Sequence, residues 1–306
     1  MGAAHRALPR RGDLGLGEPV RVLVTGANGQ LASDVLLTLA DAGDDVTAPD
    51  RANLDITDRD AVRAAVRSLR PSVIINCAAW TAVDACEGDP DRALAANGTA
   101  VGVLAEVADS VGAHLVHVST DYVFSGALDR PYTEQDVPDP LSAYGRSKLA
   151  GERAALANLP SATIVRTSWL CGEHGPNMVK TILRLAEGDT PLRFVDDQRG
   201  CPTFTADLAP LLRLLAVTRV PGIVHATNQG AVSWFEFARS VLAADGHDPD
   251  RVTPVSTSDL QPPRPAPRPA NSVLANIALQ TVGIPLLRPF GEPLHELVAR
   301  LPRSQR

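Results

Sequence analysis

Apolar runs rich in β-branched residues alternate with helical patterns through the first half of the chain. The expected strands are VRVLVTG, DVTAPD, SVIINCAA, HLVHVST and ATIVRTS, at residues 20–26, 45–50, 72–79, 114–120 and 162–168. The expected helices between them cover residues 31–43, 59–71, 89–112 and 143–159. Near-continuous apolar strands separated by helices are typical of a parallel sheet that is covered on both faces. The pattern therefore predicts an α/β fold, a Rossmann-type doubly wound parallel sheet.

A glycine-containing turn joins the first expected strand to the first expected helix. In VLVTGANGQLA, Gly26 and Gly29 lie in this turn with Asn28 between them, and Ala32 follows one helical step later. Because glycine has no side chain, backbone amides of such a turn can approach a pyrophosphate at the positive end of the helix. The Gly-x-x-Gly-x-x-Ala spacing differs from the usual dinucleotide fingerprint, but its place between a strand and a helix fits. The turn therefore indicates a dinucleotide site, with a plain turn as the weaker alternative.

The second half of the chain has a less regular pattern. The segment SDLQPPRPAPRPANS, at residues 258–272, is rich in proline and cannot continue a helix or a central strand. We predict a loose N-terminal tail at residues 1–19 and an NAD(P)-binding Rossmann domain at residues 20–168. Residues 169–306 are predicted to form mainly a substrate-binding region, with some elements returning to the Rossmann sheet.

The end of the second expected strand should lie near the adenosine ribose of a bound dinucleotide. Asp50 can accept hydrogen bonds from a free 2′-hydroxyl, whereas the neighbouring Arg51 can neutralise a 2′-phosphate. The pair leaves NADPH and NADH both open, and a solvated surface pair is the alternative. After the third strand, Ala78 and Ala79 leave room for the cofactor, although small residues there are also ordinary packing.

A tyrosine and a lysine stand four residues apart in YGRSK, within an expected helix that begins near Ser142. At this spacing Tyr144 and Lys148 share one helix face. A nearby ammonium lowers the pKa of a phenol, so we expect Tyr144 to be a proton donor near neutral pH. Thr120 and Asp121 end the fourth strand at the same edge of the sheet. Thr120 is expected to hydrogen-bond a substrate carbonyl, and a pure capping role at the strand end is the alternative.

These residues together resemble the extended short-chain dehydrogenase/reductases, and more narrowly the dTDP-4-dehydrorhamnose reductases. The resemblance runs from about Val20 to about Leu301 and is carried by TGANGQL, LDITD, NCAAWTAVDACE, STDYVFSG, YGRSKLAGE, RTSWLCGEHGPNMVKTILRLA, DDQRGCPT and RPANSVL. It implies reduction of the 4-keto group of a dTDP-4-dehydro-6-deoxyhexose by NADPH or NADH, with dTDP-4-dehydro-L-rhamnose as the first substrate to consider.

The resemblance also implies roles for individual residues. The implied catalytic residues are Thr120, Tyr144 and Lys148, and the implied substrate contacts are Thr120, Asp121 and Trp169, although Trp169 fits a core position equally well. The implied cofactor contacts are Gly26, Asn28, Gly29, Gln30, Leu31, Asp50, Arg51, Asp55, Ile56, Ala78, Ala79, Trp80, Tyr144 and Lys148. Trp80 and RPF at residues 288–290 depart from the family pattern, which leaves the identity of the sugar open. Some relatives bind Mg²⁺ near the position of Asp34, but one carboxylate is insufficient to predict a metal.

Composition narrows the range of partners. The net charge of −6 without clustered Lys and Arg argues against nucleic acid, and no apolar stretch is long enough for a membrane span. The four cysteines lack metal or disulfide spacing, which fits a reducing cytoplasmic location. The expected partners are a dTDP-sugar and, in a homodimer, a second copy of the chain. A 4-ketoreductase for another deoxysugar is the main alternative, followed by a nucleotide-sugar epimerase and a noncatalytic NADP-binding regulatory subunit.

Overall fold

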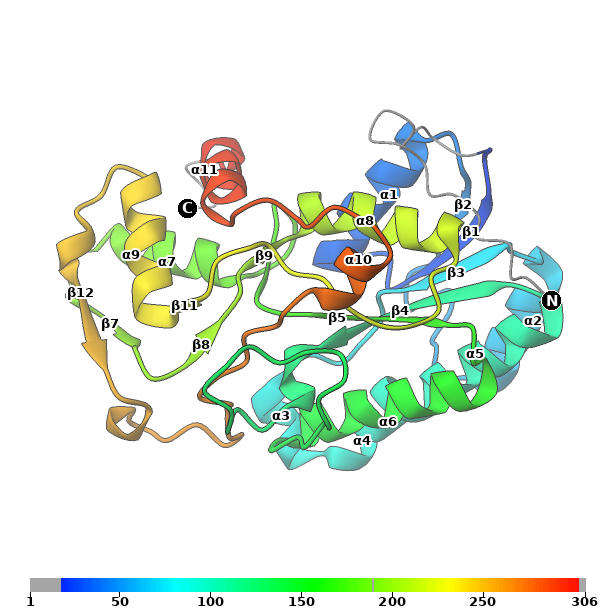
Figure 1. The fold of residues 1–306 in the computed structure, drawn as a ribbon, viewed down its shortest axis with the longest axis horizontal. Helices are drawn as coiled ribbons and strands as arrows, with labels where there is room; N and C mark the ends of the chain where they lie inside the picture. The colour runs from blue at the N-terminus through cyan, green and yellow to red at the C-terminus, as the bar shows by residue number, and fades with distance from the viewer. Residues whose placement is uncertain (1–17, 189, 303–306) are drawn as a thin grey trace.

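A six-stranded parallel sheet is the centre of the molecule in the computed structural model, which describes residues 18–188 and 190–302 (Figure 1). Most of the predicted tail, residues 1–17, lies outside the described residues. The strands are β1 (Arg21–Thr25), β2 (Asp45–Thr47), β3 (Val73–Asn76), β4 (His114–Thr120), β5 (Thr163–Thr167) and β10 (Gly222–His225), in the order β2-β1-β3-β4-β5-β10. The chain changes direction across the sheet between β1 and β3, and ligands of such sheets bind at this switch point.

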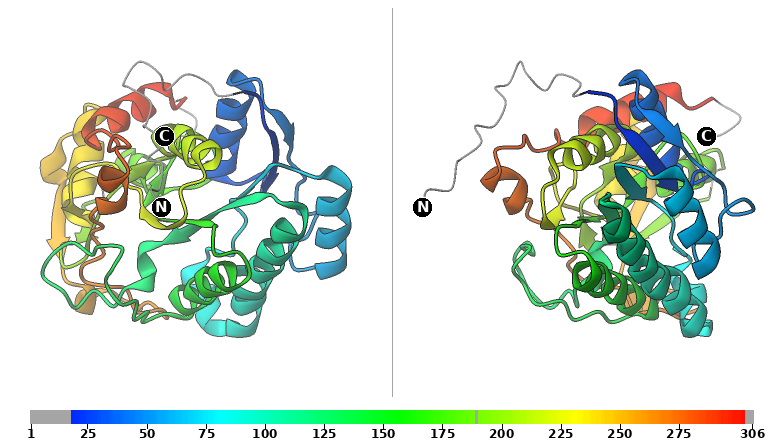
Figure 2. Two further views of the ribbon diagram at one scale, coloured as in Figure 1. Left: turned by 45° about the vertical axis from the view of Figure 1, so that its right-hand side comes forward. Right: turned by 90° about the vertical axis from the view of Figure 1, so that its right-hand side faces the viewer.

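Both faces of the sheet are covered by helices, as the apolar runs predict. Val22 and Val24 face α1 (Gln30–Asp41) and α8 (Thr205–Thr218), whereas Leu23 faces the opposite side. That opposite side is covered by α2 (Arg59–Leu69), α5 (Ala100–Val111) and α6 (Ala143–Asn158). Figure 1 shows α1 and α8 above the sheet and α5 and α6 below it, and the views of Figure 2 show the same layers.

The expected helix at residues 89–112 is divided in the structure. Short helices α3 (Val83–Gly88) and α4 (Pro90–Leu94) meet at Asp89, whose side chain accepts a hydrogen bond from the Arg92 N–H. A π-helical turn, η1 (Ala95–Thr99), then leads into α5. Single π turns within helices occur frequently at functional sites.

The later part of the chain forms a smaller lobe and also returns to the sheet. In the lobe, α7 (Met178–Ala186), α9 (Trp234–Ala244) and α11 (Gly291–Arg300) pack with the paired strands β7 (Leu192–Val195) and β12 (Val252–Val255). Shorter elements are β6 (Leu170–Cys171), β8 (Arg199–Gly200), β9 (Thr203–Phe204), β11 (Val232–Ser233), α10 (Ile277–Thr281), and the 3₁₀ turns η2 (Asp121–Val123), η3 (Pro249–Arg251) and η4 (Thr257–Asp259). The lobe lies at the left of Figure 1, while α8 and β10 belong to the sheet layers.

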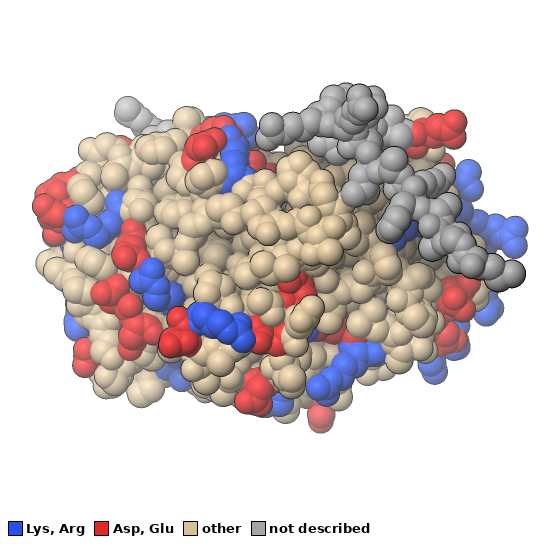
Figure 3. Space-filling view, in the orientation of Figure 1, with Lys and Arg blue, Asp and Glu red and all other residues tan. Residues whose placement is uncertain are grey.

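The proline-rich segment contains no helix or strand between Leu260 and Ala270, as its composition predicts. Its Arg268 guanidinium makes two 2.7 Å contacts with the Asp84 carboxylate of α3 and so fastens the segment beside the strand ends. On the face drawn in Figure 3, acidic and basic side chains lie close to one another. Among the described residues, no helix is both long and apolar enough to cross a membrane.

A buried ion pair joins β5 to α6 next to the strand ends. The Arg166 guanidinium donates to both carboxylate oxygens of Glu152, at 2.9 and 2.6 Å, and the two side chains are 1% and 2% exposed. The Ser119 hydroxyl at the end of β4 donates to the same carboxylate at 2.5 Å. Such a pair fixes the position of α6 relative to two central strands.

We predict that Arg166→Met lowers the free energy of unfolding by about 3–5 kcal/mol, because the Glu152 carboxylate would remain buried without its cation. Urea denaturation measures this loss. The matched control is Arg21→Met, whose partner Asp45 is 67% exposed. Solvent-exposed ion pairs contribute little to stability, so Arg21→Met should change the free energy of unfolding by less than about 1 kcal/mol. Equal losses in the two variants would contradict the structural role of the buried pair.

Candidate active site

The glycine turn after β1 forms one wall of a cavity at the switch point of the sheet. Gly26 has φ +76°, and a Cβ atom there would lie 2.7 Å from the backbone nitrogen of Ala78. Only glycine suits both the backbone angle and this close approach. Gly29 is the N-cap of α1, so the amides at the start of that helix are presented near the cavity.

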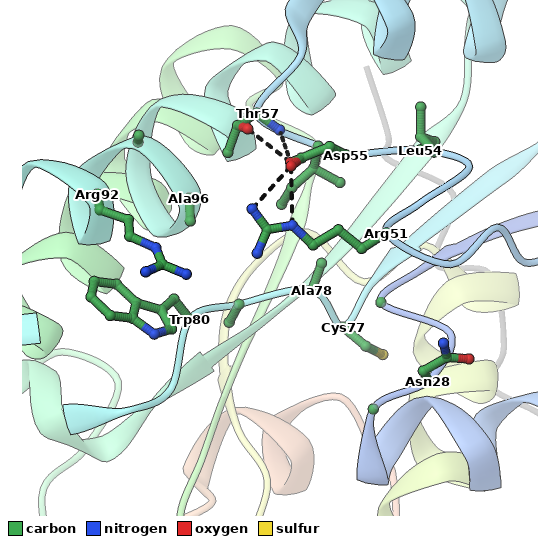
Figure 4. A pocket seen from close by; sticks show the side chains of 15 residues that line it. Asn28, Arg51, Leu54, Asp55, Thr57, Cys77, Ala78, Trp80, Arg92 and Ala96 are labelled. Atoms are coloured by element: carbon green, nitrogen blue, oxygen red, sulfur yellow. Dashed lines mark hydrogen bonds and ion pairs between the residues drawn. The ribbon is translucent and has the colours of Figure 1, made fainter. Parts of the chain in front are cut away.

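The cavity has a volume of about 390 Å³ and is shown in Figure 4. Its lining brings together nine residues implicated by the sequence, namely Gly26, Asn28, Gly29, Arg51, Asp55, Ile56, Ala78, Ala79 and Trp80. The lining also includes residues that sequence reasoning missed, namely Leu54, Thr57, Cys77, Arg92, Ala95 and Ala96. Most of the implicated cofactor residues thus share one cavity, although they come from separate loops.

Three residues implicated in cofactor binding are engaged elsewhere through their side chains. The Gln30 amide donates to the Leu170 carbonyl at 3.1 Å and accepts from the Asn177 amide at 2.7 Å. Leu31 is 5% exposed and packs in the core under α1. The Asp50 carboxylate accepts from the backbone and side chain of Asn53 at 3.0 and 2.8 Å, which fixes the turn after β2.

Arg51 and Asp55 form an ion pair within the cavity wall. The Arg51 guanidinium lies 3.0 Å from the Asp55 carboxylate, and Figure 4 shows it reaching across the cavity. Asp55 also accepts from the backbone and hydroxyl of Thr57 at 2.9 and 2.8 Å. These hydrogen bonds, with that from Arg51, hold the pKa of Asp55 below its ordinary value. The carboxylate is therefore ionised and positioned at the cavity.

Trp80 and Arg92 form the opposite wall. The Arg92 guanidinium lies over the Trp80 ring, 4.4 Å from its centroid, as Figure 4 shows. Trp80 is held in place by the fully buried Asn97 of η1, which accepts from the Trp80 N–H at 2.7 Å and donates to its carbonyl at 3.0 Å. Asn97 also donates to the Ser147 hydroxyl of α6 at 3.0 Å. The cavity wall and the helix of the tyrosine–lysine pair are thereby joined.

Thr120 and Tyr144 meet where β4 ends and α6 begins. Ser142 caps α6 as predicted, because its hydroxyl accepts from the Gly145 N–H at 3.1 Å. Tyr144 is 8% exposed, and the nearby Thr120 hydroxyl acts to lower its pKa. Burial outweighs this contact and raises the pKa of Tyr144 above its ordinary value. The expectation that Lys148 lowers this pKa is wrong for this structure, in which desolvation dominates.

Lys148 is directed toward the ends of β3 and β4. Its Nζ donates to the Val118 carbonyl at 2.7 Å and lies 3.4 Å from Nε2 of His117. Burial lowers the pKa of Lys148 to about 8, while the charges of Glu152 and Cys77 act in the opposite direction. Cys77, which lines the cavity, interacts electrostatically with Lys148, although neither Lys148 nor Tyr144 is among the lining residues.

Asp121 follows Thr120 and has an unsatisfied oxygen. Its Oδ1 accepts from the Thr120 hydroxyl at 3.0 Å, whereas its buried Oδ2 has no hydrogen-bond partner. Burial raises the pKa of Asp121 to about 6. Thr120 also caps the turn η2 through the Tyr122 N–H at 3.2 Å, so the capping alternative describes part of its role. A buried unpartnered carboxylate oxygen is costly unless a ligand uses it.

Trp169 lies in a different environment. It has φ +46° and its ring stacks on Trp234 with centroids 3.5 Å apart. It packs against the core of the smaller lobe and lines none of the 390 Å³ cavity. Its ring also lies close to Gly200, where a Cβ would approach within 2.5 Å.

The comparisons with known proteins agree on one family. The family model for the RmlD substrate binding domain matches residues 20–303. The chain belongs to this family. It is 46% identical to a dTDP-4-dehydrorhamnose reductase of Streptomyces griseus, over 90% of this chain and 92% of that protein. It is 43% identical to a probable dTDP-4,6-dihydroxy-2-methyloxan-3-one 4-ketoreductase of Streptomyces antibioticus, over 90% of this chain and 94% of that protein.

A solved structure supports the same relationship. The dTDP-4-dehydrorhamnose reductase of Bacillus anthracis, in complex with NADP, superposes with a TM-score of 0.88 at 37% identity and covers 92% of this chain and 99% of that one. The resemblance predicted from the motifs is confirmed, and so is the Rossmann-type α/β fold. The prediction of an enzyme of this reductase type is confirmed as well.

The sequence carries some signals for the residues that were missed. Asn97 and Gly98 in AANGTA are poor helix formers inside an apolar helical pattern, which indicates a local break in the helix. Arg92 and Ala96 have no comparable signal, because their position at the cavity depends on how α4 packs against α6. Within residues 18–188 and 190–302, no group of three or more His, Cys, Asp or Glu side chains is arranged to hold a metal ion.

Proposed function

We propose that this protein reduces the 4-keto group of dTDP-4-dehydro-L-rhamnose to give dTDP-L-rhamnose, with NADPH as the cofactor. The observation that supports this function best is the proximity of Thr120 and Tyr144 at the end of β4, together with a buried Lys148 close to Cys77 in the wall of the glycine-lined cavity. The reductase of Streptomyces griseus at 46% identity supports this choice of substrate.

The cavity residues fit a dinucleotide. The Gly26 position, which a Cβ would fill, suits close approach of a pyrophosphate to the start of α1. Arg51 and Asp55 stand where the adenosine end would lie, and Trp80 forms the far wall. Lys148 would hold the nicotinamide ribose by hydrogen bonds through its ammonium group. When bound, NADPH supplies the hydride that reduces the carbonyl carbon.

The protein residues supply the proton and orient the sugar. In the proposed reaction, Tyr144 transfers its phenolic proton to the carbonyl oxygen of the substrate while the Thr120 hydroxyl hydrogen-bonds that oxygen. The unpartnered Oδ2 of Asp121 is available to a hydroxyl group of the sugar. The raised pKa of Tyr144 keeps the phenol protonated, as a proton donor requires.

Two guanidinium groups in the cavity support NADPH over NADH. Arg51 follows β2, where a 2′-phosphate would lie, and Arg92 adds a second positive charge in the opposite wall. A phosphate dianion can share the Arg51 guanidinium with Asp55 or displace that carboxylate. The complex of the Bacillus anthracis relative with NADP supports the same preference.

The identity of the product tests the proposed function. The enzyme should oxidise NADPH in equal amount to dTDP-4-dehydro-L-rhamnose and release dTDP-L-rhamnose, identified by NMR of the purified nucleotide sugar. Selective turnover of an epimeric 4-keto sugar would instead indicate a ketoreductase for another deoxysugar. Conversion without net NADPH oxidation would indicate an epimerase. If the protein binds NADPH but shows no turnover, it would be a noncatalytic regulatory subunit.

We predict that Tyr144→Phe lowers kcat by about 100-fold or more, because the general acid is removed. The dissociation constant for NADPH, measured by fluorescence titration, should remain nearly unchanged. Tyr132→Phe is the matched control, since Tyr132 is a buried tyrosine that stacks on Phe124 outside the cavity lining. Unchanged turnover in Tyr144→Phe would reject the assignment.

We predict that Arg51→Ala raises KM for NADPH by about 10- to 100-fold, the value of one charge-assisted hydrogen bond of about 1.5–3 kcal/mol. KM for NADH should change by less than about twofold, because NADH lacks the 2′-phosphate. Steady-state kinetics with both cofactors measures the difference. Arg59→Ala is the control, since Arg59 pairs with Glu106 and does not line the cavity. A parallel loss with NADPH and NADH would contradict a phosphate-binding role for Arg51.

A further inference from the structure

A chain of buried polar side chains links strands β1, β3 and β4 to α6. It runs from Thr25 at the end of β1 through Asn76 of β3 and His117 of β4 to Lys148 of α6. All four side chains belong to residues that are at most 2% exposed. Nothing in the proposed reaction so far uses Asn76 or His117.

The orientation of the Asn76 amide is fixed by its neighbours. Its Oδ1 accepts from the Ala78 N–H at 3.1 Å and from the Thr25 hydroxyl at 2.7 Å. A backbone N–H only donates, so the other end of the amide, Nδ2, must be the group 3.0 Å from Nδ1 of His117. Since Nδ2 also only donates, Nδ1 of His117 must carry a lone pair.

This geometry determines where the imidazole proton lies. A neutral imidazole whose Nδ1 accepts carries its hydrogen on Nε2. Nε2 faces Nζ of Lys148 at 3.4 Å. If Lys148 is an ammonium, two hydrogen-bond donors face each other, which is unfavourable. If Lys148 is a neutral amine, its lone pair can accept a hydrogen bond from the Nε2–H of His117. Burial lowers the pKa of His117 well below its ordinary value, which keeps the imidazole neutral.

We propose that His117 is a positioning residue for Lys148: its Nε2–H, fixed through Asn76, disfavours the ammonium form and sets the pH at which Lys148 loses its proton. The effect on catalysis rests on the proposed reductase function, whereas the position of the His117 proton does not. This arrangement brings the loss of the Lys148 ammonium, the form that would hold the nicotinamide ribose, into the range near pH 8.

Burial is the largest cause of the lowered pKa of Lys148, and the charged groups near it act in the opposite direction. Cys77, on β3, and Glu152, on α6 itself, both favour the ammonium form. Glu152 is already bound by Arg166 and Ser119, so its influence on Lys148 is diminished. Tyr144, one helical turn earlier, is protonated. Among these neighbours, His117 is the one that presents a hydrogen-bond donor to Nζ.

The first test measures the tautomer directly and needs no turnover. In protein labelled with ¹⁵N at histidine, NMR of the ring nitrogens should show His117 protonated on Nε2 and unprotonated on Nδ1 near neutral pH. His117→Gln assigns its signals among those of the seven histidines. A proton on Nδ1, or a charged imidazolium, would overturn the proposal even if the protein acts on a different sugar.

The second test measures the titration of Lys148 through kcat/KM for NADPH over pH about 6 to about 10. The ammonium is the active form, so kcat/KM should fall as pH rises through about 8 in the natural protein. In His117→Gln, the amide oxygen can accept from the ammonium, and the midpoint should move upward by about one pH unit.

The controls separate this effect from a loss of packing. His114→Gln removes another buried imidazole of β4, bonded to Thr163 at 2.9 Å, and should leave the midpoint unchanged. Asn76→Asp provides a second variant should His117→Gln not fold, because a carboxylate accepts from Nδ1–H and turns the Nε2 lone pair toward Lys148. Its midpoint should also move upward. A lower rate with an unchanged midpoint in the folded variants would show a merely structural role and refute the proposal.

Discussion

The close approach of α6 to the backbone of η1 and η2 is the constraint on which the site depends. A Cβ atom at Gly145 would overlap the Tyr122 carbonyl oxygen, and one at Gly151 would overlap the Asn97 carbonyl oxygen. Glycine inside a helix lowers helix stability by about 1 kcal/mol relative to alanine, so helix propensity alone does not favour glycine at these two positions. The approach they allow brings Tyr144 to Thr120 and aims Lys148 at the ends of β3 and β4.

The same approach couples the cavity wall to α6, which carries Tyr144 and Lys148. The Asn97 side chain forms hydrogen bonds with both the N–H and the carbonyl of Trp80, and it donates a third to the Ser147 hydroxyl. The Ser147 hydroxyl donates in turn to the Tyr144 carbonyl at 2.8 Å. A displacement of the wall would therefore break hydrogen bonds of a fully buried side chain, which is costly. The π turn η1 is what directs the Asn97 side chain inward from a segment that otherwise continues as α5.

The sequence was sufficient for features determined by local pattern. The bounds of β4 and the Ser142 cap of α6 follow from an apolar run and a capping residue, both of which act within a few positions. Features that depend on contacts between distant segments were not accessible. The raised pKa of Tyr144 results from its burial against Cys86 of α3, Ala93 of α4 and Tyr122 of η2. The placement of Arg92 over Trp80 results from the division of one expected helix into three parts.

The distribution of buried charge explains why Lys148 loses its proton more readily than an exposed lysine. Lys148 of α6 and Arg166 of β5 are both buried cations, and in the described part of the chain Glu152 is the carboxylate that acts on both of them. Arg166 takes that carboxylate with two hydrogen bonds, and a guanidinium does not lose its proton in proteins. Lys148 is left with a carbonyl oxygen and an imidazole, neither of which bears a negative charge. A buried lysine in this position has a reduced proton affinity, and pairing it with Glu152 would abolish that property.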